Sequence, residues 1–345
     1  MTNQVVWLAE FTLEGGATLR DVPVAFRSWG ELNAAGDNAV VICHALTGNP
    51  EVDDWWSELL GPGKALDTNR FFVVCANVIG SPYGTVSPLT TNPDTGQPWA
   101  HAFPATTVRD TVALHRALLE TLGVRRVLFA IGGSLGGMQT LEWAFHEDFV
   151  HGLVPIGVGG RHSAWCIGWS EAQRQAIYSD PLWQEGRYAD HQPPAAGLSV
   201  ARMMAMVSYR SFASFSERFG RGRSSKQDSY EVESYLRHQG MKLVERFDAR
   251  CYVHLTNVMD THDISRDRGD YFEVLARIRQ PALVVGISTD ILYPVAEQRE
   301  LAEHMPNAEL AVMEAHQGHD AFLIEQADLA SRVIGWRERQ IDRLL

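Results

Sequence analysis

The chain has 345 residues, of which 45% are hydrophobic and 21% are charged, and its formal net charge is −12. This composition is typical of a globular protein with a sizeable core, so it excludes disordered and fibrous classes. The excess of acidic residues argues against duplex nucleic acid or an anionic membrane as a partner.

The predicted elements begin with a hairpin, after which short apolar runs alternate with helical patterns. Residues 5–11 and 22–27 resemble an antiparallel pair at the edge of a sheet. The later apolar runs lack polar alternation, which is typical of strands covered on both faces. These runs are 39–43, 71–76, 127–131, 153–158 and 282–287, and the helical patterns are 107–122, 135–145 and 294–304. The alternation predicts an α/β fold with a mostly parallel sheet flanked by helices.

This alternation stops between about residues 166 and 279. The stretch is rich in Met, Tyr and Arg and shows helical patterns at 198–207, 229–246 and 271–279. We therefore expect a core formed by residues 1–165 and 280–345, with a helical lid inserted at 166–279.

Cysteine usage and the chain's opening residues both indicate a cytoplasmic protein. Cys43, Cys75, Cys166 and Cys251 are widely spaced and include no CxxC pair, so we expect neither disulfides nor a metal site. The first residues lack the basic and apolar regions of a signal peptide, and no uncharged stretch is suited to span a bilayer.

Residues 131–137 (IGGSLGG) follow a predicted strand and open a predicted helix. The pattern G-x-S-x-G in this context is typical of a nucleophile elbow, a turn so tight that only glycine fits beside the serine. The helix that follows Ser134 helps to stabilise developing negative charge. A glycine-rich structural turn or a phosphate-binding loop is the alternative, but the P-loop pattern is missing. Ser134 is therefore the candidate nucleophile.

Such a serine needs a base, and the base needs an acid that orients it. In the α/β-hydrolase order, the acid and then the histidine follow the serine along the chain. Asp290 comes just after the predicted strand at 282–287, and His319 lies in the loop after the next strand-like run. We therefore expect a triad of Ser134, Asp290 and His319, with His316 as the alternative base.

An oxyanion hole in this fold takes one backbone N–H from the residue after the serine, here Leu135, and another from a loop after an earlier strand. Residues 44–48 (HALTG) follow the predicted strand at 39–43. Leu46 is the candidate because its side chain can anchor in the core while its amide points inward. A tight turn with no catalytic task is the alternative.

Several longer motifs resemble those of the homoserine O-acetyltransferase family. They are HALTG at 44–48, GPGKALDTNRFFVVCANVIGSPYGT at 61–85, GGSLGGMQTLEWA at 132–144, ARMMAMVSYRS at 201–211, DILYP at 290–294 and GHDAFL at 318–323. The resemblance implies an α/β-hydrolase core, a helical lid and a homodimer built through the lid. It also implies no bound cofactor, acetyl-CoA as co-substrate, and the triad and oxyanion roles given above.

The same resemblance implies two residues that bind the amino acid. In the family, an arginine of the first lid helices and the aspartate after the catalytic histidine do so, and they match Arg202 and Asp320. A guanidinium suits a carboxylate, and a carboxylate suits an ammonium group. Arg210 is the alternative to Arg202, and Asp320 taken alone would be interpreted as a helix N-cap.

We therefore predict an L-homoserine O-acetyltransferase of methionine biosynthesis that works by a ping-pong mechanism. L-Serine is an alternative acceptor, because one methylene is discriminated only about 10–200-fold by a pocket. Succinyl-CoA is an alternative donor, because the choice of acyl group depends on the shape of the acyl pocket and on any cation for a succinyl carboxylate. Residues 291–294 (ILYP) resemble the acetyl-using form. A serine esterase would use the same triad, and a non-catalytic protein of this fold is the remaining alternative.

Overall fold

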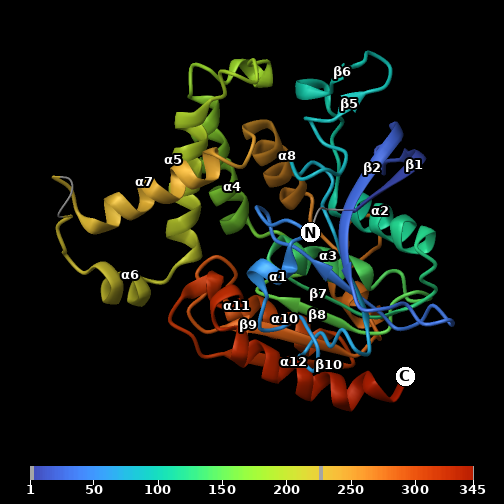
Figure 1. Cartoon of the computed structure of the whole chain (residues 1–345). Helices are drawn as coiled ribbons and strands as arrows, with labels where there is room; N and C mark the ends of the chain where they lie inside the picture. The colour runs from blue at the N-terminus through green and yellow to red at the C-terminus, as the bar shows by residue number, and fades with distance from the viewer. Residues whose placement is uncertain (1–3, 225–227, 345) are drawn as a thin grey trace.

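An eight-stranded sheet lies at the centre of the computed structural model, which describes residues 4–224 and 228–344 (Figure 1). Its strand order is β1-β2-β4-β3-β7-β8-β9-β10. The strands are β1 (Gln4–Thr12), β2 (Thr18–Trp29), β3 (Ala39–Cys43), β4 (Phe72–Ala76), β7 (Val127–Gly133), β8 (Leu153–Ile156), β9 (Ala282–Ile287) and β10 (Ala308–Met313). β2 pairs antiparallel with β1 and β4, and the strands from β4 to β10 pair in parallel. The predicted edge hairpin and the mostly parallel sheet are confirmed.

Helices cover both faces of the sheet. Alternate residues of each parallel strand point to opposite faces and so pack against different layers of helices. In β3, Val41 and Cys43 pack into a cluster that includes residues of α2, α3 and α10. Val40 and Ile42 pack into a second cluster with α1, α11 and α12. These helices are α1 (Val52–Trp55), α2 (Val108–Thr121), α3 (Leu135–Trp143), α10 (Val295–His304), α11 (Ala321–Ile324) and α12 (Gln326–Gln340).

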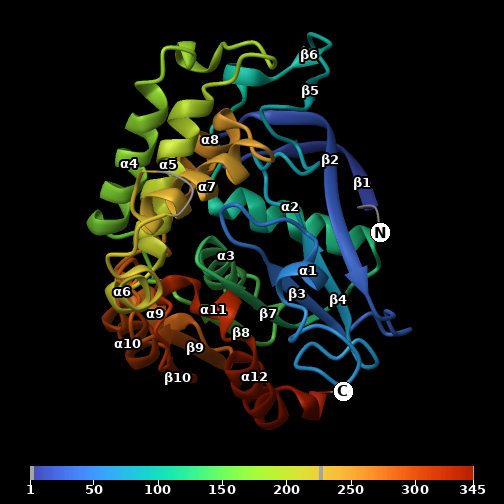
Figure 2. The same ribbon diagram turned by 60° about the vertical axis from the view of Figure 1, so that its left-hand side comes forward.

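A group of helices occupies the chain between β8 and β9. They are α4 (Ala164–Tyr178), α5 (Ala195–Tyr209), α6 (Phe212–Phe219), α7 (Glu231–Val244), α8 (Ala249–Asp260) and α9 (Tyr271–Arg277). Figures 1 and 2 show α4, α5, α7 and α8 grouped on the opposite side of the molecule from α12. The predicted helical insertion is therefore present, and its patterns at 198–207, 229–246 and 271–279 lie within or overlap α5, α7 and α9.

The remaining elements are short. They are β5 (Thr91–Asn92), β6 (Gln97–Pro98) and the 3-10 turns η1 (Ala100–Ala102), η2 (Gln184–Gly186), η3 (Gly318–Asp320) and η4 (Asp342–Leu344). Within residues 4–224 and 228–344, no helix combines the length and apolarity that crossing a membrane requires. The four cysteines are buried free thiols.

Candidate active site

Ser134 lies in the sharp turn between β7 and α3 with a backbone that serine rarely adopts. Its φ is 59° and its ψ is −124°. A non-glycine residue holds such a conformation only where its surroundings enforce it, and such residues cluster at functional sites. The Ser134 N–H donates to the Ile156 carbonyl at 2.9 Å, and the Met138 N–H donates to the Ser134 carbonyl at 3.0 Å, which starts the helix. The turn is thus fixed between β8 and α3.

The glycines of this turn allow it to touch the end of β3. A Cβ on Gly136 would lie 2.0 Å from the Cys43 carbonyl oxygen, and one on Gly132 would lie 2.4 Å from the same atom. Because the obstructing atom is backbone, it cannot move aside at low cost. Glycine at these two positions therefore brings the elbow against the loop that follows β3.

Asp290 and His319 form a buried pair at the ends of β9 and β10. The distance from Asp290 Oδ2 to His319 Nδ1 is 2.6 Å. Asp290 Oδ1 accepts hydrogen bonds from the Leu292 and Tyr293 N–H groups at 2.8 and 2.9 Å, so the carboxylate is held in place. Burial lowers the pKa of His319, but the charge and hydrogen bond of Asp290 raise it more, and the net shift is upward from 6.5.

Shared neighbours place His319 beside the turn that carries Ser134. A Cβ on Gly157, the residue after Ile156, would lie 3.3 Å from the imidazole ring of His319. The Phe322 ring lies 5.6 Å from that imidazole and also packs on Gly133. Among the described residues His319 Nε2 is buried with no hydrogen-bond partner, so this nitrogen can accept a proton.

The alternative base, His316, has a different place. Its side chain is exposed, and its carbonyl oxygen accepts a hydrogen bond from the Ser211 hydroxyl. The structure thus pairs Asp290 with His319, not with His316.

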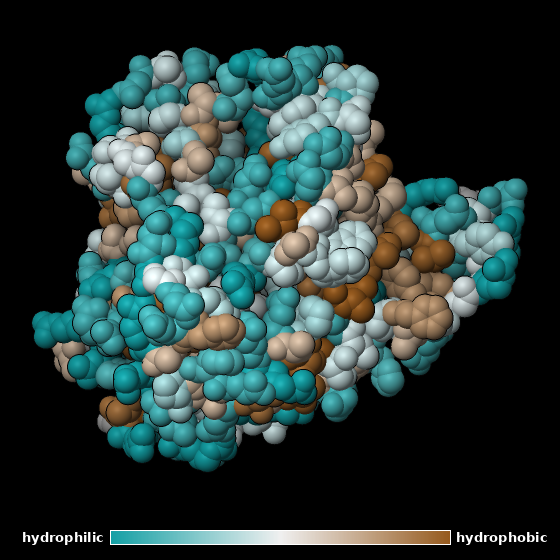
Figure 3. Space-filling view, turned by 180° about the vertical axis from the view of Figure 1, so that it is seen from behind, coloured by the Kyte–Doolittle hydropathy of each residue, from teal (hydrophilic) through white to brown (hydrophobic). Residues whose placement is uncertain are grey.

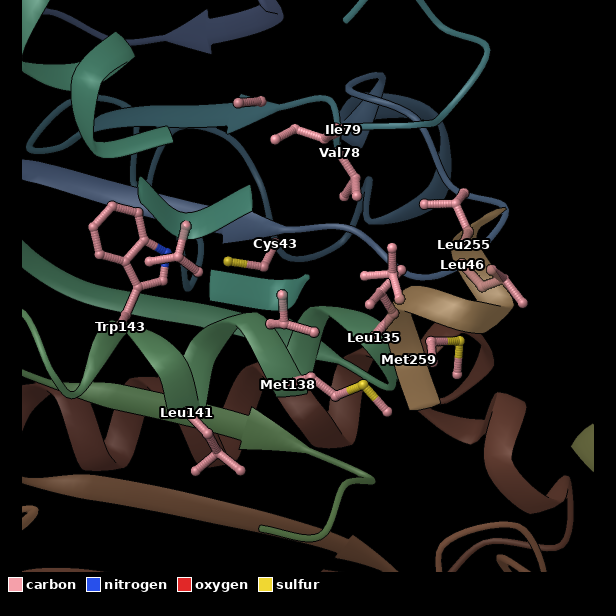
Figure 4. Packing of buried hydrophobic residues seen from close by; sticks show 14 of the residues in the cluster. Cys43, Leu46, Val78, Ile79, Leu135, Met138, Leu141, Trp143, Leu255 and Met259 are labelled. Atoms are coloured by element: carbon pink, nitrogen blue, oxygen red, sulfur yellow. The ribbon is translucent and has the colours of Figure 1, made fainter. Parts of the chain in front are cut away.

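The loop with Leu46 forms a tight turn in which the Gly48 N–H donates to the Ala45 carbonyl at 2.9 Å. Leu46 is buried, and Figure 4 shows its side chain near that of Leu135, at the end of the cluster next to Leu255 and Met259. Leu46 and Leu135, whose amides are the predicted oxyanion donors, therefore lie close together in the core.

Two buried polar side chains hold this turn in place. Sequence reasoning missed both of them. Gln139 Nε2 donates to the carbonyls of His44 at 3.2 Å and Leu135 at 3.1 Å, so it joins the loop after β3 to the first turn of α3. His44 Nε2 accepts the Val78 N–H at 3.1 Å, and its Nδ1 lies 2.9 Å from the Ala45 carbonyl. Burial lowers the pKa of His44 to about 4, so the ring is neutral at pH 7. Both residues stand inside motifs quoted above, which is the only sequence signal for them.

The two arginines proposed for the amino acid differ in their partners. Arg210 Nε lies 3.2 Å from Asp320 Oδ2. The guanidinium of Arg202 lies 5.6 Å from the Tyr209 ring, and that ring lies 5.8 Å from the imidazole of His319. Arg202, Arg210 and Asp320 thus gather on one side of His319.

Asp320 begins α11, but its side chain makes no capping hydrogen bond. Burial raises the pKa of this carboxyl, while Arg210, His319 and Arg202 lower it in that order, and the net shift is upward from 3.8. The carboxylate therefore faces Arg210 and does not cap the helix.

A cavity of about 300 Å³ adjoins the elbow. Its lining comes from several parts of the chain. Gly133 belongs to the elbow and Phe322 to α11, Thr47 and Gly48 belong to the loop after β3, and Arg202 and Arg246 come from the helical insertion. This volume is at the lower end of small-molecule sites, and two guanidinium groups make it suited to an anionic or zwitterionic ligand.

Comparison with known proteins places this geometry in a family. A model of the alpha/beta hydrolase fold matches residues 38–326. The homoserine O-acetyltransferase of Salinibacter ruber is 60% identical over 342 residues, 97% of each chain. That of Trichormus variabilis is 55% identical over 329 residues, 95% of this chain and 91% of the other. The crystal structure of esterase E22 has a TM-score of 0.89 at 26% identity, covering 97% of this chain and 99% of the esterase. With the fold model matched over most of its length and relatives this similar from end to end, the chain belongs to the homoserine O-acetyltransferase family of the alpha/beta hydrolase fold.

Proposed function

We propose that the protein is an L-homoserine O-acetyltransferase that transfers the acetyl group of acetyl-CoA through an acetyl-Ser134 intermediate. The observation that carries the proposal is the placement of Arg202 and Asp320 beside the buried His319–Asp290 pair. A simple hydrolase does not need paired groups for a zwitterion at this position. The names of the two relatives support the same donor and acceptor.

In the first half-reaction His319 Nε2 takes the proton of the Ser134 hydroxyl, and the serine oxygen attacks the thioester carbonyl. The amides of Leu46 and Leu135 hold the resulting oxyanion. The carbon–sulfur bond then breaks, the thiolate takes the proton from His319, and CoA leaves acetyl-Ser134. Asp290 stabilises the imidazolium that exists between these two proton transfers.

In the second half-reaction homoserine enters with its carboxylate on Arg202 and its ammonium on Asp320. Its hydroxyl gives a proton to His319 and attacks the acetyl carbonyl. The bond to Ser134 breaks, and the serine oxygen recovers the proton. Transfer outpaces hydrolysis because the oriented hydroxyl has an effective concentration that water in a covered site lacks.

The proposal includes the organisation of the molecule. Residues 166–279 would act as the lid, and residues 1–165 with 280–345 as the catalytic core of a cytoplasmic enzyme of methionine synthesis. Two copies would associate through the lid. In support of this, apolar side chains of the helical insertion are exposed, among them Phe212 at 87% and Trp165 at 54%. Figure 3 shows apolar surface around the base of the part that projects from the body.

Ester hydrolysis is the second candidate, because esterase E22 has a similar fold over nearly its whole length. Thiol release tests both functions. Acetyl-CoA and succinyl-CoA are each supplied with L-homoserine, with L-serine and with no acceptor, and Ser134→Ala is the control. We expect release that needs acetyl-CoA and homoserine together and that is lost in the variant. Release that is equally fast without an acceptor would assign hydrolysis and contradict the proposal.

A further inference from the structure

Arg246 follows α7 and connects the helical insertion to the turn after β3. Its Nη1 donates to the Thr47 carbonyl at 2.8 Å and to the Tyr83 hydroxyl at 2.5 Å. Thr47 follows Leu46 in the turn closed by the bond from Gly48 to Ala45. The arginine therefore holds the Thr47–Gly48 peptide, which lies two peptide units after the one that carries the proposed oxyanion donor, the Leu46 N–H.

The core holds the other end of the same turn. Gln139 binds the His44 carbonyl, and His44 in turn contacts Ala45 and Val78. Gln139, on α3, and Val78, after β4, are fully buried in the core. The Thr47 end is held from the helical insertion, so the shape of the turn depends on how that insertion sits.

The backbone that carries Arg246 is itself well anchored. The next residue, Phe247, is 6% exposed and belongs to the main hydrophobic cluster. Its ring lies 5.8 Å from the Tyr83 ring and 6.2 Å from the Tyr252 ring. The two hydrogen bonds of Arg246 thus start from a backbone that its neighbour Phe247 already holds in place.

We infer that Arg246 is a positioning residue that fixes the turn at residues 44–48, which carries the proposed oxyanion donor. The geometry of the oxyanion hole therefore depends on the contact between the helical insertion and this turn. The inference rests on the proposed function, because it assigns the Leu46 amide to the oxyanion. Both half-reactions pass through an oxyanion at this place, so loss of Arg246 slows both of them. Arg246 also lines the cavity, but its Nη1 is bound to Thr47 and Tyr83, so we expect its loss to affect the rates more than the KM values.

Arg246→Gln and Arg246→Lys test the inference, with Lys242→Gln as a matched control at an exposed position of α7. Four kinds of quantity are measured for each variant: the rate of thiol release in the first turnover, kcat, KM (for each of the two substrates) and Tm. A fifth is the rate at which a fluorophosphonate labels Ser134, a reaction that places a phosphoryl oxygen in the oxyanion hole without CoA or homoserine.

Removing a whole oxyanion donor typically lowers kcat by about 10²–10³-fold. Displacing a donor without removing it should therefore lower kcat by less, about 10–100-fold. We expect Arg246→Gln to lose about this factor in both half-reactions and in labelling, with KM values and Tm close to those of the wild type. Arg246→Lys should recover part of the rate, because an ammonium can still donate to the Thr47 carbonyl.

A raised KM with an unchanged labelling rate would make Arg246 a substrate-binding residue and overturn the inference. Wild-type values throughout, or a loss of rate that only follows a fall in Tm, would overturn it too. Tyr83→Phe keeps the bond to Thr47, so a loss as large as that of Arg246→Gln would place the effect on the tyrosine hydroxyl instead. If the wild type labels but transfers no acetyl group, the proposed function fails, and the labelling comparison still judges the inference.

Discussion

At the scale of single residues, Gly136 sets how closely the elbow and the loop after β3 approach. Because an added Cβ would lie 2.0 Å from the backbone oxygen of Cys43, Gly136→Ala should destabilise the fold by about 1–3 kcal/mol and lower kcat. Urea unfolding and thiol-release assays measure the two effects.

Gly168→Ala is the matched control. This exposed glycine lies inside α4, and an added Cβ would meet nothing within 4 Å. The substitution should stabilise the protein by about 0.5–1 kcal/mol, because alanine loses less backbone freedom in a helix. Equal effects of the two substitutions would show that the close approach at Gly136 is not the cause.

We expect the pH dependence of acetylation to follow the titration of His319, the proposed base. Only the neutral imidazole can take the serine proton, so kcat/KM for acetyl-CoA should rise with pH, with a midpoint above 6.5 because the pKa of His319 is raised. Asp290→Asn removes the charge that raises this pKa and leaves burial to lower it. The midpoint should then move to lower pH, along with a large loss of rate.

A second group could titrate in the same pH range and change the rate there, since burial raises the pKa of Glu297 to about 7. Glu297→Gln is therefore the control for the pH profile. A midpoint that disappears in this variant would assign the titration to Glu297 and not to His319.

At the scale of elements, the segment between α5 and α6 lies against the loop of His319. A Cβ on Gly318 would be 2.8 Å from the backbone of Arg210, and the Ser211 hydroxyl binds the His316 carbonyl. Arg210 also pairs with Asp320. The helical insertion thus places a cation beside the carboxylate that is proposed to bind the acceptor.

Arg210→Met should therefore weaken acceptor binding. Without its first cation the buried carboxyl of Asp320 has a higher pKa, and a neutral carboxyl cannot pair with an ammonium group. We expect the KM for homoserine to rise about tenfold, the first-turnover thiol release to stay the same, and the defect to shrink at higher pH. Arg218→Met, on an exposed face of α6, is the control. A KM for homoserine that stays at the wild-type value would contradict this role.

The elements also show what a sequence pattern can and cannot predict. The buried strands were predictable because dense apolar runs have few other structures open to them, and α12 could have been found from Leu329, Val333 and Trp336 at helical spacing. α8 was hidden because it buries Arg250 and Thr256 among its apolar residues, which obscures the period.

The same division holds in the site. Ser134, Asp290 and His319 stand in local motifs at strand ends, so the sequence alone points to them. The bonds of Gln139 to His44, of Arg210 to Asp320 and of Arg246 to Thr47 join segments far apart in the chain. No local pattern encodes such contacts, because they depend on how distant segments of the chain pack against one another.

At the scale of the whole molecule, several buried or half-buried histidines make stability depend on pH. Burial lowers the pKa to about 4 for five of them: His44, His115, His146, His254 and His262. Below pH 6.5 the unfolded chain binds protons that the folded chain does not, so stability should fall as pH drops from about 6.5 toward 4. Each histidine adds up to about 1.4 kcal/mol per pH unit to this slope.

Urea unfolding at pH 7.5, 6 and 5 measures the slope directly. His254→Gln should reduce it, and His191→Gln, at an exposed position, should leave it unchanged. An unfolding free energy that stays flat over this range would refute the assignment.

Assembly is the other property of the whole molecule. Phe212 is 87% exposed on the helical insertion, so Phe212→Glu should weaken a dimer without harming the fold. Trp7→Glu is the control, because Trp7 is 65% exposed on β1, far from α6 in Figure 1. Sedimentation should give a dimer mass for the wild type and the control and a lower mass for the first variant. A monomer mass for the wild type would contradict the proposed dimer.

The pairing of β8 with β9 has a consequence for the order in which the protein is made. Leu153 and Ile156 are neighbours of Ala282 and Val285 in the sheet, yet the whole helical insertion is synthesised between them. A growing chain therefore possesses the elbow with Ser134 long before it possesses Asp290 and His319. Until the last two strands dock, the nascent polypeptide lacks the base proposed for Ser134, so we expect it not to consume acetyl-CoA on the ribosome.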